Sequence, residues 1–409
     1  MLSGKEPGRW ISGAWLRALG VTFALSASLV LAILVTPLAG AQTFSILYGF
    51  GRGADGRSPQ AGLIWTPGGG LYGTTFLGGN PSCSCGTVFK LFPNGDFTVV
   101  HTFTGADGAN PSAVLMADPK DNLYGTTSQG GAGGPGAGTV FKLAPPAGRG
   151  GSWTETVLYT FSGGLDGANP YAGVMQDEAG NLYGTTTRGG ASGYGTVFEV
   201  DTTGKETVLY SFSGTPDGAY PYASMVRDTS GNLYGTTYEG GSANYGTVFK
   251  LDTTGKETVL HNFAGAGGGA YPNAGLTIDA NGDFFGTTNE GGDTQSGGTI
   301  FKIDNTGIFT TLHTFTGGGD GASPESGVVM DSLGNLYGAT NEGGDYDNDG
   351  TVFKLTQAGS LTTLHTFTAG GGGAYPYSAL AIDPAGDLYG TTVGVGPYGN
   401  GVVYQLTAK

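Results

Sequence analysis

The most chemically suggestive stretch of the sequence spans residues 345–350, which read Asp-Tyr-Asp-Asn-Asp-Gly. Carboxylates at alternate positions offer hard oxygen ligands that can surround a calcium ion, and the closing glycine allows a tight turn. An EF-hand would require Glu where this chain has Thr356, so we expect a calcium loop on a β-hairpin, with Asp345, Asp347 and Asp349 as ligands. The alternative is a polar turn that binds no ion.

The four histidines all fall at one position of a pattern that the chain repeats. Histidine alternates there with tyrosine, and the residues at this position are Tyr48, His101, Tyr159, Tyr210, His261, His313 and His365. Because histidine and tyrosine interchange at a repeated position of an outer strand, we expect these side chains to pack or to make hydrogen bonds rather than to act as a general base. The G-x-S-x-G, H-E-x-x-H and phosphate-loop motifs do not occur. The sequence therefore predicts no catalytic residue.

Two further sets of residues are candidates for binding a ligand. The first set occupies one aligned position in three successive copies and comprises Glu239, Glu290 and Glu342, where the other copies have Leu77, Gln129, Arg188 and Gly394. The second set precedes a proline in loops of the Asp-Gly-Ala-x-Pro type and comprises Tyr220, Tyr271 and Tyr375. Tyrosine rings and carboxylates suit a carbohydrate or a peptide, but solvated surface residues vary in the same way, so both interpretations stand.

These residues belong to a tandem repeat that recurs about every 50 residues. The string Tyr-Gly-Thr-Thr or a close variant marks each copy, with its glycine at Gly73, Gly125, Gly184, Gly235, Gly286, Gly338 and Gly390. Each copy holds four short apolar or β-branched segments bounded by Gly, Asp, Asn and Pro, which is typical of strands. In the fourth copy they are residues 223–227, 232–237 and 247–251, and a segment that starts at residue 207 or 258.

Seven copies of four antiparallel strands predict an all-β fold, a seven-bladed β-propeller whose radial repetition protects the sheet edges. A lone strand at residues 44–50 precedes the first copy, and the last copy, residues 378–406, supplies only three strands. We expect the lone strand to be the outermost strand of the C-terminal blade and so to close the ring. An open solenoid would instead need capping repeats. Residues 42–409 would then form one domain.

The loops of such a blade divide between two faces. The Asp-Gly-Ala-x-Pro loops and the loops after Tyr-Gly-Thr-Thr share one face, and the short hairpins occupy the other. Binding residues usually lie in variable loops on a rigid scaffold. We therefore expect function on the first face, in variable inserts such as residues 238–245.

The consensus Pro-x-Ala-Gly-Leu-x-x-Asp-x-x-Gly-Asn-Leu-Tyr-Gly-Thr-Thr-x-x-Gly-Gly, followed by Gly-Thr-Val-Phe-Lys-Leu, resembles the Gloeobacter and Verrucomicrobia (GloVer) tandem repeat of choice-of-anchor surface proteins. The resemblance covers about residues 43–406. It implies an exported bacterial repeat protein without an established activity. The portion Gly-Leu-x-x-Asp-x-x-Gly-Asn-Leu-Tyr is more distantly similar to NHL and lactonase-like propellers, which bears on the fold and little on the chemistry.

The first 41 residues are of a different kind. Arg9 and Arg17 precede an apolar run at residues 18–35, and Ala39-Gly40-Ala41 has the A-x-A form of a cleavage site. This pattern predicts a signal peptide at residues 1–41 and export to an extracellular, cell-surface or periplasmic location. The alternative is an uncleaved N-terminal anchor, and in either case we expect no membrane span in the repeat region.

Composition narrows the partners. The net charge of -15 argues against nucleic acid as a partner, and we expect none, because phosphate binding needs clustered Lys and Arg. The two cysteines, Cys83 and Cys85, stand one residue apart, so a local or intermolecular disulfide, inert thiols and metal ligands are all open. We expect a monomer.

The sequence thus predicts a binding or surface-interaction module for a carbohydrate or protein ligand, with calcium as its one suggested cofactor. The alternatives are a lactonase- or lyase-like propeller enzyme with a central metal and a structural component of the envelope. An enzyme should place non-repeated carboxylates, His or Asn at the mouth of the central pore. A binding module should spread residue variation over the loop face.

Overall fold

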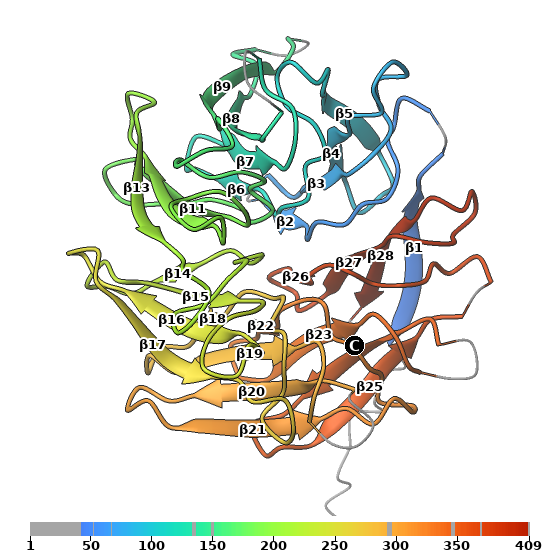
Figure 1. The fold of residues 1–409 in the computed structure, drawn as a ribbon. Helices are drawn as coiled ribbons and strands as arrows, with labels where there is room; N and C mark the ends of the chain where they lie inside the picture. The colour runs from blue at the N-terminus through green and yellow to red at the C-terminus, as the bar shows by residue number, and fades with distance from the viewer. Residues whose placement is uncertain are drawn as a thin grey trace, which may run out of the picture. The chain divides into compact units, whose positions relative to one another are not determined.

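A computed structural model of the chain describes residues 42–51, 53–66, 68–132, 136–148, 151–292, 297–344, 348–368 and 370–407. These residues form seven four-stranded sheets, the blades, which follow one another around a ring in chain order (Figure 1). The seven-bladed all-β propeller expected from the repeat is confirmed. The signal peptide predicted at residues 1–41 lies outside the described residues. Within the described ranges, no helix has the length and apolar character of a membrane span.

Each blade begins with a strand of two residues near the axis of the ring. These inner strands are β2 (Ile64–Trp65), β6 (Met116–Ala117), β10 (Met175–Gln176), β14 (Val226–Arg227), β18 (Thr277–Ile278), β22 (Val329–Met330) and β26 (Ala381–Ile382). The longer strand predicted at residues 223–227 is wrong, because only its last two residues join the ladder. The residues before β14 pack against the neighbouring blade instead, so that a Cβ on Gly275 would lie 2.9 Å from the backbone oxygen of Ser224. Crowding at the axis therefore limits the ladder.

The second strand of each blade carries the Tyr-Gly-Thr-Thr string. These strands are β3 (Leu71–Thr75), β7 (Leu123–Thr127), β11 (Leu182–Thr186), β15 (Leu233–Thr237), β19 (Phe284–Thr288), β23 (Leu336–Thr340) and β27 (Leu388–Thr392). In blade 4, Gly235 is opposite Phe249 in the ladder, and a Cβ on this glycine would lie 2.8 Å from the Phe249 ring. The close approach of a buried ring accounts for the glycine in the string.

The third strands supply the centre of the hydrophobic core. They are β4 (Thr87–Leu91), β8 (Thr139–Ala144), β12 (Thr196–Val200), β16 (Thr247–Leu251), β20 (Thr299–Ile303), β24 (Thr351–Leu355) and β28 (Val402–Thr407). Core clusters combine residues of adjacent blades, as where Val197 and Phe212 of blade 3 pack with Met225 and Phe249 of blade 4. The rings of Phe212 and Phe249 meet edge to face with centroids 5.1 Å apart. The blades are thus joined mainly by aromatic and aliphatic packing.

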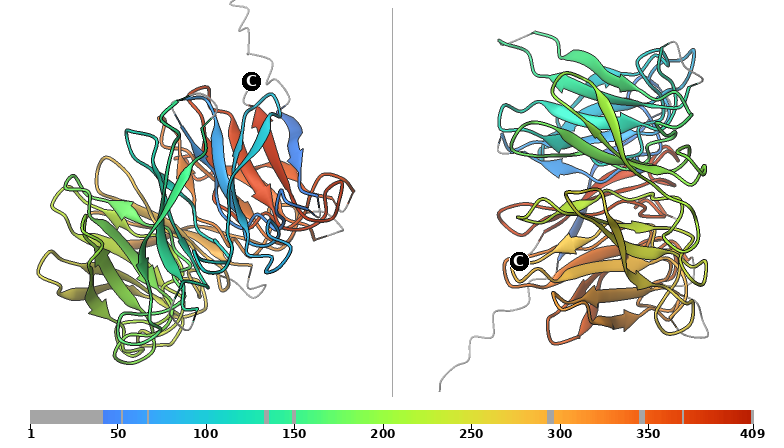
Figure 2. Two further views of the ribbon diagram at one scale, coloured as in Figure 1. Left: turned by 90° about the horizontal axis from the view of Figure 1, so that it is seen from above. Right: turned by 60° about the vertical axis from the view of Figure 1, so that its left-hand side comes forward.

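The outer strands include the one that closes the ring. They are β5 (Phe97–Thr102), β9 (Thr154–Thr160), β13 (Glu206–Ser211), β17 (Glu257–Asn262), β21 (Phe309–Thr314), β25 (Leu361–Thr366) and β1 (Thr43–Gly49). Strand β1 pairs antiparallel with β28 of the last blade, which confirms the predicted closure. Figure 2 shows this blue N-terminal strand beside the red C-terminal strands. Phe44 of β1 also stacks on His365 of blade 6, with ring centroids 3.9 Å apart.

The threonines of the string join blades to one another close to the axis. The Thr236 hydroxyl donates a hydrogen bond to the backbone oxygen of Ala274 in the next blade at 2.9 Å. The next residue, Thr237, pairs its hydroxyl with that of Thr247 in the same blade at 2.8 Å. Blade 6 has Ala339 in place of the first threonine. The string therefore holds the inner segment of the following blade in six of the seven copies.

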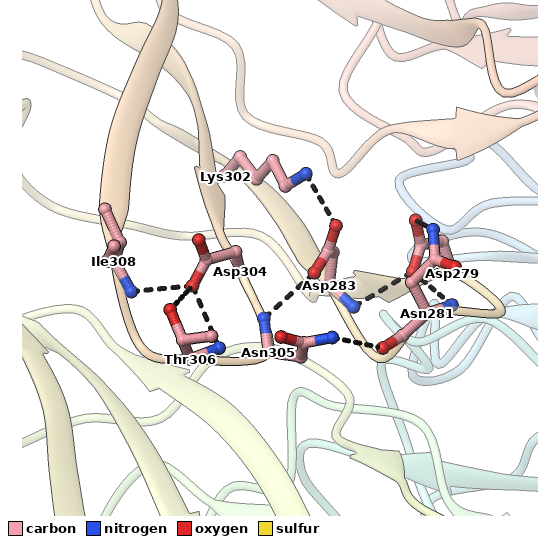
Figure 3. Close-up of polar contacts among 8 residues, drawn as sticks. All are labelled: Asp279, Asn281, Asp283, Lys302, Asp304, Asn305, Thr306 and Ile308. Atoms are coloured by element: carbon pink, nitrogen blue, oxygen red, sulfur yellow. Dashed lines mark hydrogen bonds and ion pairs between the residues drawn. The ribbon is translucent and has the colours of Figure 1, made fainter.

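The short hairpins lie on the opposite face, and their carboxylates stabilise turns. In blade 5 the Asp279 carboxylate accepts hydrogen bonds from the backbone N–H groups of Asn281 and Asp283 at 2.8 and 2.9 Å (Figure 3). Asp304 accepts bonds from the backbone N–H groups of Thr306 and Ile308 in the same way. Local bonds of this kind are typical of Asx turns. The hairpin carboxylates thus have a structural role.

Candidate functional site

Seven chain segments enter the axis from the loop face, and each places one variable side chain in a central cavity of about 500 Å³. Each of these residues follows the proline of its loop and precedes Ala or Ser. We call the set the axial ring, and it comprises Gln60, Ser112, Tyr171, Tyr222, Asn273, Glu325 and Tyr377. The backbone repeats around the axis while the side chains differ. The site is therefore chemically asymmetric on a symmetric scaffold.

The residue before each proline sets the direction in which the axial segment enters. All seven such residues adopt a left-handed backbone with φ between 53° and 60°, namely Ser58, Asn110, Asn169, Tyr220, Tyr271, Ser323 and Tyr375. Asparagine and serine tolerate this conformation better than a bulky tyrosine does. In blades 2 and 3, Asn110 and Asn169 also donate their side-chain amides to backbone oxygens of the preceding blade, at 3.0 and 2.8 Å. The loop geometry is thus common to all blades.

One carboxylate belongs to the axial ring. Glu325 is partly buried and accepts a hydrogen bond from the side-chain amide of Asn273 at 2.5 Å, which links blades 5 and 6. Burial raises the pKa of Glu325 above its usual range, and the Asn273 bond opposes that shift. A carboxylate keeps further acceptor sites after one such bond. Glu325 can therefore accept hydrogen bonds from a ligand in the cavity.

Four tyrosines, Tyr171, Tyr222, Tyr238 and Tyr377, also line the cavity. Tyr171 and Tyr222 meet edge to face with centroids 5.6 Å apart, and Tyr222 meets Tyr238 at the same distance. Burial, followed by the charge of Glu325, raises the pKa of Tyr377 to about 12. The phenol of Tyr377 is therefore protonated at neutral pH. Aromatic faces and hydroxyl groups thus share one cavity with a carboxylate.

Two buried polar oxygens at the cavity have no hydrogen-bond partner among the described residues. They are the side-chain oxygen of Asn289 and the hydroxyl of Ser326, which is 4% exposed. Buried polar groups are normally satisfied by protein, water or ligand. The described lining contains no Lys or Arg and one carboxylate, Glu325. The cavity is therefore suited to a neutral ligand with hydroxyl or amide groups.

The predicted glutamates lie on the loop face, where their backbones pair with the neighbouring loop. Glu239, Glu290 and Glu342 form isolated antiparallel bridges with Ala219, Ala270 and Ala322. The bridges confirm that the two kinds of loop share a face. Because the backbone makes these contacts, the side-chain type is free to vary, as the aligned Arg188 and Gly394 illustrate. Whether these carboxylates bind a ligand stays a prediction.

The three predicted tyrosines differ in their surroundings. Tyr271 meets Tyr238 at 5.0 Å and Tyr245 at 5.5 Å, so it adjoins the tyrosines of the cavity. Tyr220 meets Tyr194 at 5.7 Å and lies under the guanidinium of Arg188. Tyr375 is 40% exposed and makes no ring contact with another described aromatic residue. The structure thus places Tyr271 beside Tyr238 but outside the cavity lining, and it leaves Tyr375 apart from these rings.

The alternating His and Tyr residues have the structural role expected of them. In five of the seven repeats, this side chain on the outer strand hydrogen-bonds to the aspartate of the following loop, as in Tyr210 to Asp217 at 2.5 Å and His101 to Asp107 at 3.1 Å. In the other two repeats Gly268 and Gly372 replace the aspartate, and the histidine stacks on a phenylalanine instead. Burial there lowers the pKa of His365 to about 4. None of these residues lines the cavity.

The proposed calcium ligands Asp345 and Asp347 lie outside the described residues. Asp349 is described and is 3% exposed, and its backbone oxygen accepts a hydrogen bond from the Tyr375 N–H at 3.0 Å. The neighbouring Asn348 accepts a bond from the Gly343 N–H through its side chain. Over the described ranges, no group of three or more His, Cys, Asp or Glu residues is placed to hold a metal. Calcium at this loop stays a prediction.

The two cysteines form a disulfide with each other, Cys83 to Cys85, in the variable loop of blade 1. Of the three possibilities for this pair, the structure has the local bridge. Neither sulfur is then available as a thiol or metal ligand.

The axial ring was not identified from the sequence, although a signal was present. The signal is that the residue after each loop proline varies between two nearly constant neighbours, the proline and Ala or Ser. Of the insert at residues 238–245, Tyr238 lines the cavity, and Tyr245 lies outside the lining in contact with Tyr271. The insert forms the edge of the site, and the axial ring forms its centre.

Comparison with known proteins agrees with the repeat and the fold. The sequence model of the Gloeobacter/Verrucomicrobia repeat matches residues 33–226 and 136–346. No curated protein matches the sequence.

Several solved structures share the fold at low identity. One is PorZ, a bacterial surface component of the type-IX secretion system of Porphyromonas gingivalis, with a TM-score of 0.54, 17% identity, and coverage of 88% of this chain and 48% of PorZ. Another is the extracellular domain of a putative hybrid two-component system from B. thetaiotaomicron, with a TM-score of 0.58, 10% identity, and coverage of 88% of this chain and 39% of that one. The chain thus spans less than half of each.

A putative 6-phosphogluconolactonase from Bacteroides uniformis has a TM-score of 0.51 at 18% identity, and the alignment covers 79% of this chain and 89% of that one. The expected likeness to lactonase-like propellers is confirmed at the level of fold. Because the repeat model matches most of the sequence and the fold repeats with it, the chain belongs to the Gloeobacter/Verrucomicrobia repeat family.

Proposed function

We propose that this propeller is an exported binding module and that its axial cavity binds a carbohydrate. The observation that carries the proposal is the axial ring, at which seven equivalent loops present five residue types to a shared cavity. Three tyrosines, an asparagine and a glutamate at this position place aromatic faces and hydrogen-bonding groups in one concave space, as is typical of small-molecule sites.

The chemistry of the cavity favours a neutral, hydroxylated ligand. Tyrosine faces provide apolar contact for the C–H faces of a sugar ring, and Glu325 and the Asn289 side-chain oxygen accept hydrogen bonds from its hydroxyl groups. The absence of Lys and Arg from the described lining, together with the net charge of -15, disfavours phosphorylated or acidic ligands. The cavity volume of about 500 Å³ is that of an ordinary small-molecule site.

Export is supported by the sequence pattern of residues 1–41 and by the repeat family. An extracellular, cell-surface or periplasmic location would give the module access to glycans. PorZ, a surface component of a secretion system, shares the fold at 17% identity, and this likeness bears on the architecture alone.

The test is a glycan array and a peptide array, each probed with purified residues 42–409 and with two variants. Tyr222→Ser introduces the residue that Ser112 provides at the same ring position in blade 2, so we expect it to fold normally. We expect the parent to bind one class of neutral glycan and the variant to lose about tenfold in affinity, or about 1.4 kcal/mol. Tyr398→Ser, at a residue that is 62% exposed, is the control. Binding to peptides alone, or silence on both arrays, would contradict the proposal.

A second candidate is a lactonase- or lyase-like enzyme with a central metal. The observation that favours it is the presence of Glu325, Asn273 and Asn289 together at the cavity, because oxygen ligands of this kind suit a hard cation such as calcium. These three residues would hold the cation, which would supply a Lewis acid for a carbonyl substrate. Metal analysis of the purified protein, with Glu325→Gln as comparison, tests this candidate. A metal content that is zero or unaffected by the substitution would exclude it.

A further inference from the structure

A line of five tyrosines leads from the axial cavity across the loop face of blades 3 to 5. We call it the tyrosine track, and its members are Tyr171, Tyr222, Tyr238, Tyr271 and Tyr245. Successive rings are in contact, with centroids 5.6, 5.6, 5.0 and 5.5 Å apart. All five side chains are partly exposed. The track is therefore a continuous aromatic surface open to solvent.

The track is not one repeated position. Tyr171 and Tyr222 follow loop prolines, Tyr238 follows a Tyr-Gly-Thr-Thr string, Tyr271 precedes a proline, and Tyr245 precedes the glycine of the next strand. The five tyrosines thus come from four different positions of the repeat, and the fold brings their rings together. At the position of Tyr238, the other blades have Phe76, Ser128, Thr187, Asn289, Asn341 and Val393. A chance drift at a single position would not build such a surface.

Backbone contacts hold the track in place. The Tyr271 N–H donates to the backbone oxygen of Tyr245 at 2.9 Å, and the Tyr271 oxygen accepts from the N–H of Asn289 at 3.1 Å. Tyr271 adopts φ 56°, a conformation that is unfavourable for a bulky residue. At the equivalent positions, Asn110 and Asn169 fit this backbone better and add a bond to the preceding blade. Tyr271 thus occupies this backbone position without the side-chain bond that asparagine makes in blades 2 and 3.

Carboxylates accompany the track on the loop face. Burial, followed by the charge of Glu290, raises the pKa of Tyr238 and of Tyr271 above the usual range. Glu239 adds to the same effect at both tyrosines. Their phenols therefore stay protonated at neutral pH and, with the carboxylates, offer both donors and acceptors along an aromatic surface. Such a surface suits a chain of neutral hydroxylated units.

Resting on the carbohydrate-binding function proposed above, we propose that the ligand is a linear oligosaccharide, with one end in the axial cavity and the following units lying along the tyrosine track toward Tyr271 and Tyr245. The cavity alone would recognise a monosaccharide. The track adds contacts that only a longer chain can reach.

The experiment measures affinity against chain length by calorimetry, with gluco-, xylo-, manno- and galacto-oligosaccharides of one, three and six units and a proline-rich peptide as probes. The test variant is Tyr271→Asn, which introduces the residue of blades 2 and 3 and keeps the left-handed backbone. The control is Tyr375→Asn, the same substitution at the aligned position of blade 7, where no described ring contact joins the tyrosine to the track.

We expect one series to bind at least tenfold more tightly as hexasaccharide than as monosaccharide. Tyr271→Asn should remove most of that gain and leave the monosaccharide affinity unchanged, and Tyr375→Asn should alter neither. Equal affinity at all chain lengths, or a hexasaccharide affinity that Tyr271→Asn does not change, would show that the ligand does not bind along the tyrosine track. Either result would leave the proposal for the cavity intact. Binding of the peptide alone, or of no probe, would overturn both.

Discussion

The side-chain amide of Asn273 donates a hydrogen bond to the Glu325 carboxylate at 2.5 Å, across the axis-facing boundary between blades 5 and 6. Both residues occupy the same position of the repeat, one blade apart, and neither type recurs at that position in another blade. A scaffold built from seven similar units thus carries a local, non-symmetric polar pair in its central cavity. The pair distinguishes one sector of the ring chemically.

Glu325→Gln tests the role of that carboxylate. The side-chain oxygen of Gln can still accept the hydrogen bond from Asn273. It lacks the negative charge of the carboxylate, so it is a weaker acceptor for the hydroxyl groups of a ligand. We expect glycan affinity to fall about tenfold at neutral pH, or about 1.4 kcal/mol, and the melting temperature to stay equal or rise, because a desolvated charge is removed. Calorimetry and thermal unfolding measure the two effects.

The pH dependence of binding gives an independent readout for the same variant. Since the pKa of Glu325 is raised, its carboxyl gains a proton at a higher pH than an ordinary glutamate. The parent should therefore lose glycan affinity as the pH is lowered through that raised pKa, whereas Glu325→Gln should show a flat profile. A parent profile as flat as that of the variant would argue against Glu325 as an acceptor.

A second prediction concerns glutamates at the start of two outer strands. Burial, followed by the charge of Asp166 or Asp217, raises the pKa of Glu206 and of Glu257 to about 7. Their folded pKa exceeds the unfolded value of about 4.3, so the unfolded state ionises first as the pH rises. The folded state then loses stability between about pH 4 and pH 7 and levels off above.

The double variant Glu206→Gln, Glu257→Gln should flatten this part of the stability profile. Both side chains are partly exposed, so after allowance for solvent screening we expect a gain of about 1 kcal/mol each at pH 8 and little change at pH 4. Urea unfolding at the two pH values measures it, with the exposed Glu178→Gln as control. If the unfolding free energy of the double variant depends on pH as that of the parent does, Glu206 and Glu257 are not the source of the predicted loss of stability.

The fold was predictable because its determinants are repeated residues. Gly235 is required by the ring of Phe249, and Thr236 bonds the next blade, so each copy records the same contacts and seven copies define a closed ring. Closure by β1 followed from counting strands at the two ends of the repeat. The length of β14 was not predictable, because crowding at the axis comes from other blades.

The site was less predictable because it is built from different positions of the repeat. Tyr222, Tyr238 and Tyr271 belong to three aligned positions, and their proximity follows from the convergence of blades 4 and 5. No sequence motif marks Glu325, and its pairing with Asn273 of the neighbouring blade is visible only in the fold. A comparison of copies finds positions that vary, but only the fold shows which of them share a cavity.

A third prediction concerns the hydrogen bonds that join an outer strand to the loop after it. Asp217 is 5% exposed and accepts hydrogen bonds from the Tyr210 hydroxyl and the Ser213 hydroxyl at 2.5 and 2.7 Å. Asp217→Ala leaves these donors without their acceptor and should cost about 2 to 3 kcal/mol in unfolding free energy. Tyr210→His should cost less than about 1 kcal/mol, because histidine makes the same bond in His101–Asp107. Similar losses for both variants would show that the two side chains are not interchangeable.

A fourth prediction tests the closure of the ring. Phe44 of β1 stacks on His365 and contacts Tyr404, so Phe44→Ala should lower the unfolding free energy by about 2 kcal/mol. Ile46 of the same strand is 38% exposed, and Ile46→Ala should cost less than about 1 kcal/mol. Chemical denaturation compares them, and equal small losses would mean that the aromatic contacts of β1 contribute little to closure.

The most direct test of the central claim is hydroxyl-radical footprinting of the protein with and without a bound neutral glycan, read out by mass spectrometry at each tyrosine. Binding in the axial cavity should protect Tyr222 and Tyr377 and leave Tyr398, which is 62% exposed and outside the cavity lining, as reactive as before. Protection of Tyr398 with unchanged Tyr222 and Tyr377 would place the ligand elsewhere and contradict the account.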